Sequence, residues 1–362
     1  MKHVSFLFAS LLLLVGQSVY AQAPDAEPEP EVSDEEPLDE QIEEELDEEA
    51  EEADDPGEPG GRGPAQDPLP EDPTPEPGPN IVHEAEVGGS LGQTVSTPDD
   101  AVLSDEVVEE IRSRGGTAVA SYDSVATFST AANMVKTAID NFGRVDILCH
   151  VAGILRDRMI FNMSEEEWDA VLAVHLKGAF NSVRHTIPHM IQQKYGRICL
   201  FSSGSGLGNT GQANYAAAKE GMVGFARVLA QELAPFNISV NAIYPGGNTR
   251  MTGSVPDAAR ELRTARGVIG GGQMAGRSTV AAEGARDADN NAPKVVYLCT
   301  EPGGSITGQV IGTAGWQMSL YSPRHVIRSI HKDGRWTLDE LEELIPVSLA
   351  AGIINPAPPP TQ

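Results

Sequence analysis

The amino-acid sequence predicts an α/β domain built on a doubly wound parallel sheet, preceded by a signal peptide and a long acidic segment. From residue 81 onward, short apolar runs alternate with segments of helical periodicity. This alternation is typical of parallel strands joined by helices that cover both faces of the sheet. The remaining chain, about 280 residues, is long enough for one such domain with a full core.

The elements can be placed in order by their apolar periodicity and by the residues that start and stop them. Six apolar runs are expected to be strands: 81–86, 118–122, 145–151, 197–201, 238–243 and 309–312. Helices are expected over 100–114, 127–142, 164–194, 213–234, 291–300 and 338–350. Residues 252–290, rich in Gly and Ala, are expected to form a mobile excursion, and a Pro-rich tail at 356–362 ends the domain of residues 81–355.

Residues 1–23 have the pattern of a secretory signal peptide. Lys2 and His3 form a short basic start, and residues 4–15 form an apolar core that is short for a membrane span. Small residues near position 23 suit cleavage, so we expect an exported chain, periplasmic or secreted, with no membrane span after cleavage. An uncleaved N-terminal anchor is the alternative.

The acidic segment at residues 24–80 differs in composition from everything that follows. It holds 24 Asp and Glu residues against one basic residue, Arg62, and 13 of the 26 prolines of the chain. Like charges repel, and so few apolar side chains cannot offset the entropy of ordering. We therefore expect a disordered, extended spacer. The domain that follows carries 23 basic and 29 acidic residues, so the chain's net charge of −28 belongs mainly to the spacer.

The three cysteines, Cys149, Cys199 and Cys299, exclude a disulfide framework. Each lies in an apolar stretch, where a buried thiol behaves as a small hydrophobic group. This usage is typical of cytosolic proteins, although the N-terminus predicts export. No metal site is expected.

The most informative chemical motif is Tyr215-Ala216-Ala217-Ala218-Lys219, about twelve residues after Ser202-Ser203. If this stretch is helical, Tyr215 and Lys219 share one face. A neighbouring ammonium favours the phenolate, which lowers the pKa of a tyrosine and suits it to pass a proton to or from an alcohol or carbonyl oxygen. A serine hydroxyl can orient the same oxygen. Such a site suits oxidation of a secondary alcohol, with a nicotinamide handling the hydride.

From about residue 81 to 350 the chain resembles the short-chain dehydrogenase/reductase family, and most closely its hydroxyacyl-CoA dehydrogenase branch from peroxisomal multifunctional enzymes. The stretches that carry the resemblance are VGGSL at 87–91, YDSVA at 122–126, AGILRDRMIFNMSEEEWDAV at 152–171, HLKG at 175–178, GQANYAAAK at 211–219 and ITGQV at 306–310. The resemblance implies a Rossmann-like fold with strand order 3-2-1-4-5-6-7, NAD or NADP as cofactor, and a small secondary alcohol or ketone, such as a 3-hydroxyacyl thioester, as substrate.

The resemblance also assigns catalytic roles. Tyr215 would be the acid/base, with Lys219 tuning its pKa and contacting the ribose. Ser203 would bind the substrate oxygen, but its spacing to Tyr215 is one residue shorter than usual, so Ser202 is an alternative. His175 stands where the family has a helix asparagine that kinks the backbone and holds a relay water.

Further positions would contact the cofactor. Asp123 would bind the adenine, or simply end a strand, and Glu86 would bind the ribose 2′-hydroxyl, which favours NAD over NADP. The family's Asn-Asn-Ala-Gly is His150-Val151-Ala152-Gly153 here, so Val151 loses an amide. The remaining cofactor contacts implied by the resemblance are Ala152, Gly153, Tyr215, Lys219, Pro245, Gly246 and Thr249.

The first strand and the glycine-rich phosphate turn of the family are expected to be missing. Gly57, Gly61 and Gly63 fit the glycine spacing, but an acidic run precedes them and prolines that exclude a helix follow. A central strand would then be absent, leaving two strand edges unpaired unless a neighbouring strand or a partner fills the gap.

Three interpretations of the chain follow. It is an NAD(P)-dependent oxidoreductase, or an exported non-catalytic pseudoenzyme or binding module that has lost cofactor binding, or a joining of unrelated segments near Asn80. Whether it is an active enzyme is therefore left open. No nucleic acid is expected as a partner, and homo-oligomers through 164–194 and 213–234 are an expectation taken from the family.

Overall fold

The computed structural model of the chain describes residues 11–14, 80–84, 98–247, 284 and 287–353. Its centre is an eight-stranded sheet in the order β3-β2-β1-β4-β5-β6-β7-β8. All neighbouring strands run parallel except β8, which pairs antiparallel with β7. The predicted doubly wound α/β fold is confirmed, and β8 (Ser319–Leu320) is an addition that the sequence did not indicate.

The predicted strands lie within a few residues of their expected positions. They are β2 (Asn80–Glu84), β3 (Thr117–Ser121), β4 (Ile147–His150), β5 (Gly196–Phe201), β6 (Ile238–Tyr244) and β7 (Val310–Gly312). The residues of β6 are all buried, as are those of β4, because helices cover both faces of a parallel sheet.

The central position of the sheet is filled by β1 (Leu11–Leu14), from the segment that the sequence assigns to a signal peptide. Leu12 pairs with Val82 of β2 on one side and with Leu148 of β4 on the other. The sheet therefore differs from the expected one, because the edges of β2 and β4 that were expected to be unpaired are both paired with β1. Gly57, Gly61 and Gly63, which fit the glycine spacing but were not expected to form a phosphate turn, lie outside the described residues.

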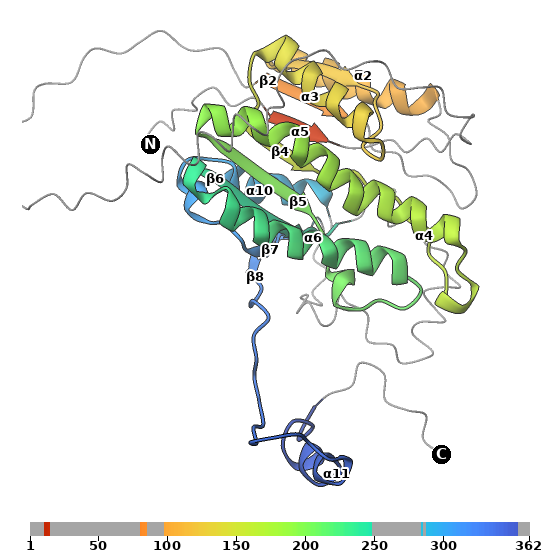
Figure 1. Ribbon diagram of the computed structural model, residues 1–362. Helices are drawn as coiled ribbons and strands as arrows, with labels where there is room; N and C mark the ends of the chain where they lie inside the picture. Colours follow the sequence, from red (N-terminus) through yellow and green to blue (C-terminus); the bar gives the residue numbers. More distant parts are fainter. Residues whose placement is uncertain (1–10, 15–79, 85–97, 248–283, 285–286, 354–362) are drawn as a thin grey trace, which may run out of the picture. The chain divides into compact units, whose positions relative to one another are not determined.

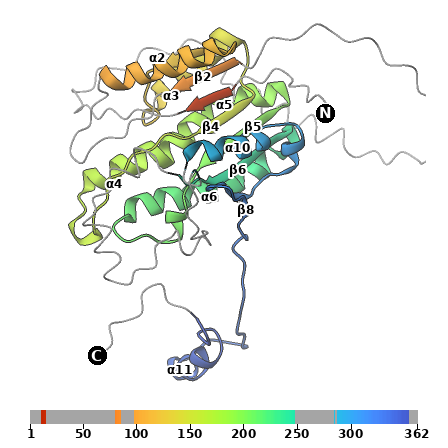
Figure 2. The same ribbon diagram turned by 180° about the vertical axis from the view of Figure 1, so that it is seen from behind.

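Helices lie on both sides of the sheet (Figures 1 and 2). On one side are α3 (Phe128–Phe142), α5 (Gly178–Gln193) and α6 (Ala213–Glu232). They pack on a large apolar core that includes Leu148, Ile198 and Val240. On the other side are α2 (Pro98–Ser113) and α10 (Ala292–Leu298). The two faces alternate along each strand, as the period of a β-strand requires.

Helix starts and stops follow the signals in the sequence. Ser164 caps α4 (Glu165–Leu172) in a capping box with Glu167. Thr337 caps α11 (Leu338–Val347) in the same way with Glu340. After α3 the chain turns at Gly143, whose φ of 74° is the left-handed conformation that glycine adopts without strain.

Two further expectations were a mobile excursion at residues 252–290 and the absence of a membrane span. Most of the predicted excursion at 252–290, including Thr249 just before it, lies outside the described residues. Among the helices that are described, none is both long and apolar enough to cross a bilayer.

Candidate active site

The proposed acid/base pair lies on α6, where helical spacing places Tyr215 and Lys219 on one face. The Lys219 ammonium lies 5.5 Å from the centre of the Tyr215 ring. Tyr215 is half-buried, and Lys219 is only 3% exposed. The Lys219 Nζ also donates a hydrogen bond to the backbone carbonyl of Phe201, at the end of β5. This bond fixes the ammonium, so the sequence-predicted pair is brought together beside the carboxyl end of a central strand.

A buried lysine of this kind sets the electrostatics of the site. The pKa of His175 is strongly lowered. Burial is the larger cause, and the Lys219 charge is the second. The same two causes lower the pKa of His150 to about 3. Both imidazoles are therefore neutral near neutral pH. Among Tyr215, Lys219, His150 and His175, only Lys219 carries a positive charge. This charge favours negative charge on a nearby phenolate oxygen.

His175 lies in a π-helical turn, Ala173–Lys177, between α4 and α5. A π-helical turn is a local widening that often marks a functional position, and here it stands where the resemblance implied a kink. His175 is fully buried, with its ring edge-on to that of Tyr215 at a centroid distance of 5.0 Å. Its Nε2 lies 2.8 Å from the carbonyl oxygen of Ile154, whereas its Nδ1 has no hydrogen-bond partner among the described residues.

His150 was not singled out as a site residue, yet it belongs to this group. It ends β4 and is fully buried. Its Nδ1 lies 3.4 Å from the Ser182 hydroxyl, and its Nε2 has no partner within the described residues. The sequence carried a signal for this position, since His150 replaces the first asparagine of the family motif.

The structure separates the two serines that the sequence left as alternatives. Ser202 is 2% exposed, and its hydroxyl donates a 2.5 Å hydrogen bond to the carbonyl oxygen of Lys219. Ser203 is half-buried and opens the 3₁₀ turn Gly204–Leu207, where its hydroxyl accepts a hydrogen bond from the Ser205 amide. A hydroxyl that accepts still has its own proton to donate. Ser202 thus serves the lysine backbone, and Ser203 is the serine available to a substrate oxygen.

Three of the residues expected to contact the cofactor lie at the carboxyl ends of β3 and β4. Asp123 follows β3 and accepts hydrogen bonds from Ser121 and Asn133, each 3.3 Å long. Ala152 and Gly153 follow β4 and are buried. A side chain at Gly153 would place its Cβ 2.5 Å from Cε1 of His175, so this glycine allows the histidine to approach the backbone.

Pro245 and Gly246 follow β6 at the same edge of the sheet, near the nicotinamide end of the expected site. Asn291, which the sequence did not indicate, fixes this turn, because its side chain accepts from the Gly246 amide at 3.3 Å and donates to the Gly246 carbonyl at 3.1 Å. It also accepts a 2.7 Å hydrogen bond from Thr313. The predicted contacts Glu86 and Thr249 lie outside the described residues.

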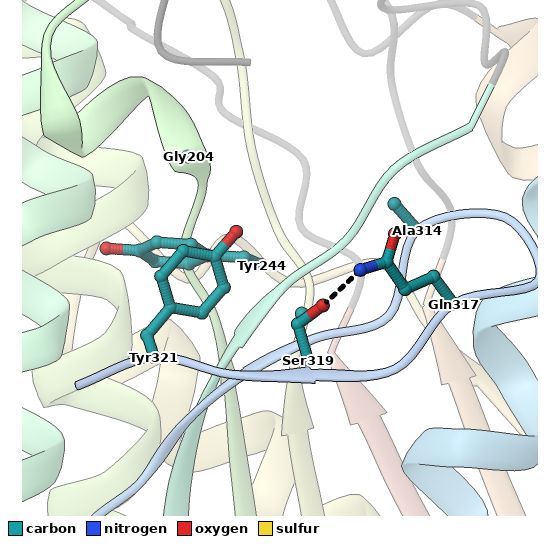
Figure 3. A pocket seen from close by; sticks show the side chains of 7 residues that line it. Gly204, Tyr244, Ala314, Gln317, Ser319 and Tyr321 are labelled. Carbon is teal, nitrogen blue, oxygen red and sulfur yellow. Dashed lines mark hydrogen bonds between the residues drawn. The ribbon is translucent and has the colours of Figure 1, made fainter. Parts of the chain in front are cut away.

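A small hollow opens beside this edge, next to the Ser203 turn (Figure 3). Tyr244 and Tyr321 form one wall, with ring centroids 4.8 Å apart, and the Tyr244 hydroxyl donates to Glu220 at 3.1 Å. Burial raises the pKa of Tyr244, with the Glu220 carboxylate adding to the effect, so this tyrosine stays protonated. The residues that line the hollow are Gly204, Tyr244, Gly312, Ala314, Gln317, Ser319 and Tyr321.

The residues at the carboxyl ends of the strands fit a dinucleotide. In doubly wound sheets ligands bind at the carboxyl ends of the strands, where the chain reverses its direction of crossing. Asp123, Gly153, Lys219 and Gly246 all lie at that edge, from four different segments of the chain. A carboxylate there can accept from an adenine amino group, and the ammonium can donate to ribose hydroxyls.

Comparison with known proteins places the chain in a class of enzymes. Residues 93–260 match the model of the short chain dehydrogenase family. A crystal structure of a short chain dehydrogenase from Mycobacterium avium superposes with a TM-score of 0.61 at 34% identity, covering 78% of this chain and 88% of that one. The chain therefore belongs to the short-chain dehydrogenase/reductase family, as its motifs implied.

Two curated enzymes are similar in sequence to part of this chain. Peroxisomal multifunctional enzyme type 2 of Mus musculus is 50% identical over 152 residues, which are 42% of this chain and 20% of that protein. The 3-oxoacyl-[acyl-carrier-protein] reductase of Thermotoga maritima is 40% identical over 184 residues, 50% of this chain and 70% of that protein. The chain spans between 17% and 66% of the length of several other curated relatives.

Proposed function

We propose that the protein is an NAD(P)-dependent oxidoreductase that interconverts a secondary alcohol and a ketone, with a 3-hydroxyacyl thioester as substrate. The observation that carries the proposal is the placement of Lys219 beside Tyr215, with Ser203 on the adjoining turn. The substrate class rests on the two relatives just described, one a multifunctional peroxisomal enzyme and the other a reductase of 3-oxoacyl thioesters.

In this proposal Tyr215 moves a proton at the substrate oxygen. For oxidation, its phenolate accepts the hydroxyl proton, and for reduction its phenol donates one. The Lys219 ammonium, held by the Phe201 carbonyl, stabilises the phenolate. The Ser203 hydroxyl donates to the same substrate oxygen and so orients the carbon that exchanges hydride. The neutral His175 supports the Tyr215 ring from one side without adding charge.

The nicotinamide, when bound, accepts or supplies the hydride. Lys219 would contact the ribose that carries it, and Gly246 would line the carboxamide end. Asp123 would bind the adenine, and Glu86 favours NAD over NADP by repelling a 2′-phosphate. The hollow beside Gly204, lined by Tyr244 and Gln317, would receive the part of the substrate nearest the reacting oxygen.

A direct assay tests this proposal on the full chain. We expect NADH formation at 340 nm with a 3-hydroxyacyl-CoA and NAD, and quenching of tryptophan fluorescence on adding NAD. Loss of general acid–base catalysis should make Tyr215→Phe slower by roughly 10²–10⁴-fold. Tyr297→Phe is the matched control, because Tyr297 is about half exposed on α10 and should keep full activity.

The same assay separates the enzyme from the non-catalytic alternative. An exported pseudoenzyme would show neither turnover nor fluorescence quenching at millimolar NAD or NADP. Quenching without turnover of any acyl thioester would instead keep the dinucleotide and reject the substrate class. Simple secondary alcohols would then be the next substrates to assay.

Export is also a proposal. It is supported by the basic start and apolar core of residues 1–15, although cleavage near residue 23 would remove β1 from the sheet. Mass spectrometry of the protein isolated from its native cells decides between cleavage and retention. An N-terminal peptide beginning near residue 24 supports export, and a peptide that contains Leu11–Leu14 contradicts cleavage.

A further inference from the structure

The three cysteines of the chain meet in one place, on the side of the sheet opposite the helix that carries Tyr215. Cys149 lies on β4, Cys199 on β5, and Cys299 directly after α10. Their three sulfur atoms all lie within 4.8 Å of one another, and the Sγ atoms of Cys199 and Cys299 are 3.8 Å apart. None of them forms a disulfide.

The register of the sheet brings the three thiols together. Cys149 and Cys199 are direct partners across the parallel strands β4 and β5, so their side chains leave the same face side by side. The last turn of α10 then places Cys299 over them, with its amide bonded to the carbonyl of Val295 at 3.2 Å. A slip of one residue in either strand would separate the thiols. The cluster therefore depends on tertiary structure and not on any local motif.

The three thiols are buried among apolar side chains. All three cysteines are buried, and the side chains packed around them include Ile147, Ile243 and Ile311. Within the described part of the chain, no other His, Cys, Asp or Glu joins the group. A site with three sulfur ligands among apolar side chains suits a soft ion with low coordination number, because thiolates select soft ions and Zn²⁺ almost always takes four ligands.

One buried cation stands beside the cluster. Arg197 lies two residues before Cys199 on β5, is 3% exposed, and donates to the carbonyl of Thr300, next to Cys299. Burying a thiolate without compensation is costly, and Arg197 supplies part of that compensation.

The geometry points to a binding site for a single thiophilic monovalent ion, Cu(I), coordinated by Cys149, Cys199 and Cys299. With metal–sulfur bonds of about 2.3 Å, sulfurs around a trigonal ion lie about 4.0 Å apart. The 3.8 Å separation of Cys199 and Cys299 already matches this value. On binding, each thiol releases its proton to solvent and three sulfur–copper bonds form, with no change in the oxidation state of copper or sulfur.

The test uses the full, reduced chain under anaerobic conditions, with Cu(I) supplied as its acetonitrile complex. After dialysis against a chromophoric Cu(I) chelator, we expect one copper retained per chain. Cys299→Ala, Cys199→Ala and Cys149→Ala should each weaken retention by roughly 100-fold or more, since each removes a ligand. Ile311→Val is the matched control, because it trims the same apolar cluster without removing sulfur and should retain copper like the wild type.

X-ray absorption at the copper edge of the wild-type protein provides a measurement that needs no variant to fold. Three sulfur neighbours and no nitrogen or oxygen neighbour would support the site. Coordination by nitrogen or oxygen, or equal retention of copper by the triple Cys→Ala variant, would overturn it. So would the absence of retained copper in a wild-type protein whose three thiols titrate as free after unfolding.

Discussion

The imidazole of His175 packs edge-on against the phenol ring of Tyr215, with the two ring planes at 86° and the centroids 5.0 Å apart. On its other side the same imidazole touches the backbone at Gly153 and bonds to that of Ile154. Tyr215, the proposed acid/base, is therefore positioned by a histidine that packs between a helix and the end of β4. Any change that moves this histidine should move the tyrosine.

Gly153→Ala tests this dependence without altering either ring. The new Cβ would lie 2.5 Å from Cε1 of His175, so the imidazole must shift toward Tyr215. We expect kcat to fall by roughly 10–100-fold because small misplacements of catalytic groups are costly. Steady-state kinetics measures this effect. Gly143→Ala is the control, since its Cβ meets nothing within 4 Å and only the left-handed φ opposes it. Equal kcat for the two variants would contradict the positioning role.

Replacing each of the two neighbouring serines by alanine should affect kcat and stability differently. Ser203→Ala removes the hydroxyl proposed to orient the substrate oxygen, so we expect a large loss of kcat. Because the Ser205 amide also loses its acceptor, the free energy of unfolding should fall by about 0.5–2 kcal/mol. Ser202→Ala leaves the buried Lys219 carbonyl without its 2.5 Å partner, which should lower the free energy of unfolding by roughly 1–3 kcal/mol. Kinetics and thermal unfolding on both variants distinguish the roles. A Ser202→Ala variant that unfolds normally but has lost kcat would reverse them.

Much of the fold follows from periodicity and turn signals that act locally. The helices α3 and α11 and the strands β3 to β7 lie close to their predicted positions because each depends on neighbours in sequence. The Tyr215–Lys219 pair was predictable for the same reason, since both residues lie on one helix. The choice between Ser202 and Ser203 was not predictable, because it depends on the burial of one hydroxyl against α6.

Contacts between distant segments account for what the sequence did not indicate. Asn291 reaches Gly246 across 45 residues, and the cysteine cluster joins three elements. The apolar run that includes Leu11–Leu14 is ambiguous in isolation, because a signal peptide and a buried strand share the same composition. Only pairing with β2 and β4 distinguishes them, and the long acidic segment between β1 and β2 conceals that relationship.

Acid should destabilise the protein through its buried histidines. Burial and Lys219 lower the pKa of His150 to about 3, whereas an unfolded histidine titrates near 6.5. Between these values the unfolded state binds more protons, so stability falls as the pH drops from about 6.5 toward 3. Each such group contributes a slope of up to about 1.4 kcal/mol per pH unit.

His150→Asn removes one of these groups while keeping a polar side chain at the end of β4. We expect a shallower loss of stability between pH 6 and 4 than in the wild type, measured by urea unfolding at each pH. His185→Asn is the control, because His185 is more exposed than the fully buried His150 and lies outside the group around Lys219. Identical pH slopes for wild type and His150→Asn would contradict the assignment.

Leu12→Pro tests whether the N-terminal apolar run is the central strand of the sheet. Leu12 pairs with both Val82 and Leu148, and proline in a central strand removes a ladder hydrogen bond and crowds its neighbour. We expect a loss of at least roughly 1–3 kcal/mol in protein produced without export, and a chain lacking residues 1–23 should not unfold cooperatively. Leu12→Ile, which keeps the amide and suits a strand, is the matched control. Thermal unfolding with the same midpoint for Leu12→Pro, Leu12→Ile and the wild type would mean that β1 contributes nothing to the folded domain, and the sheet would then have to close directly between β2 and β4.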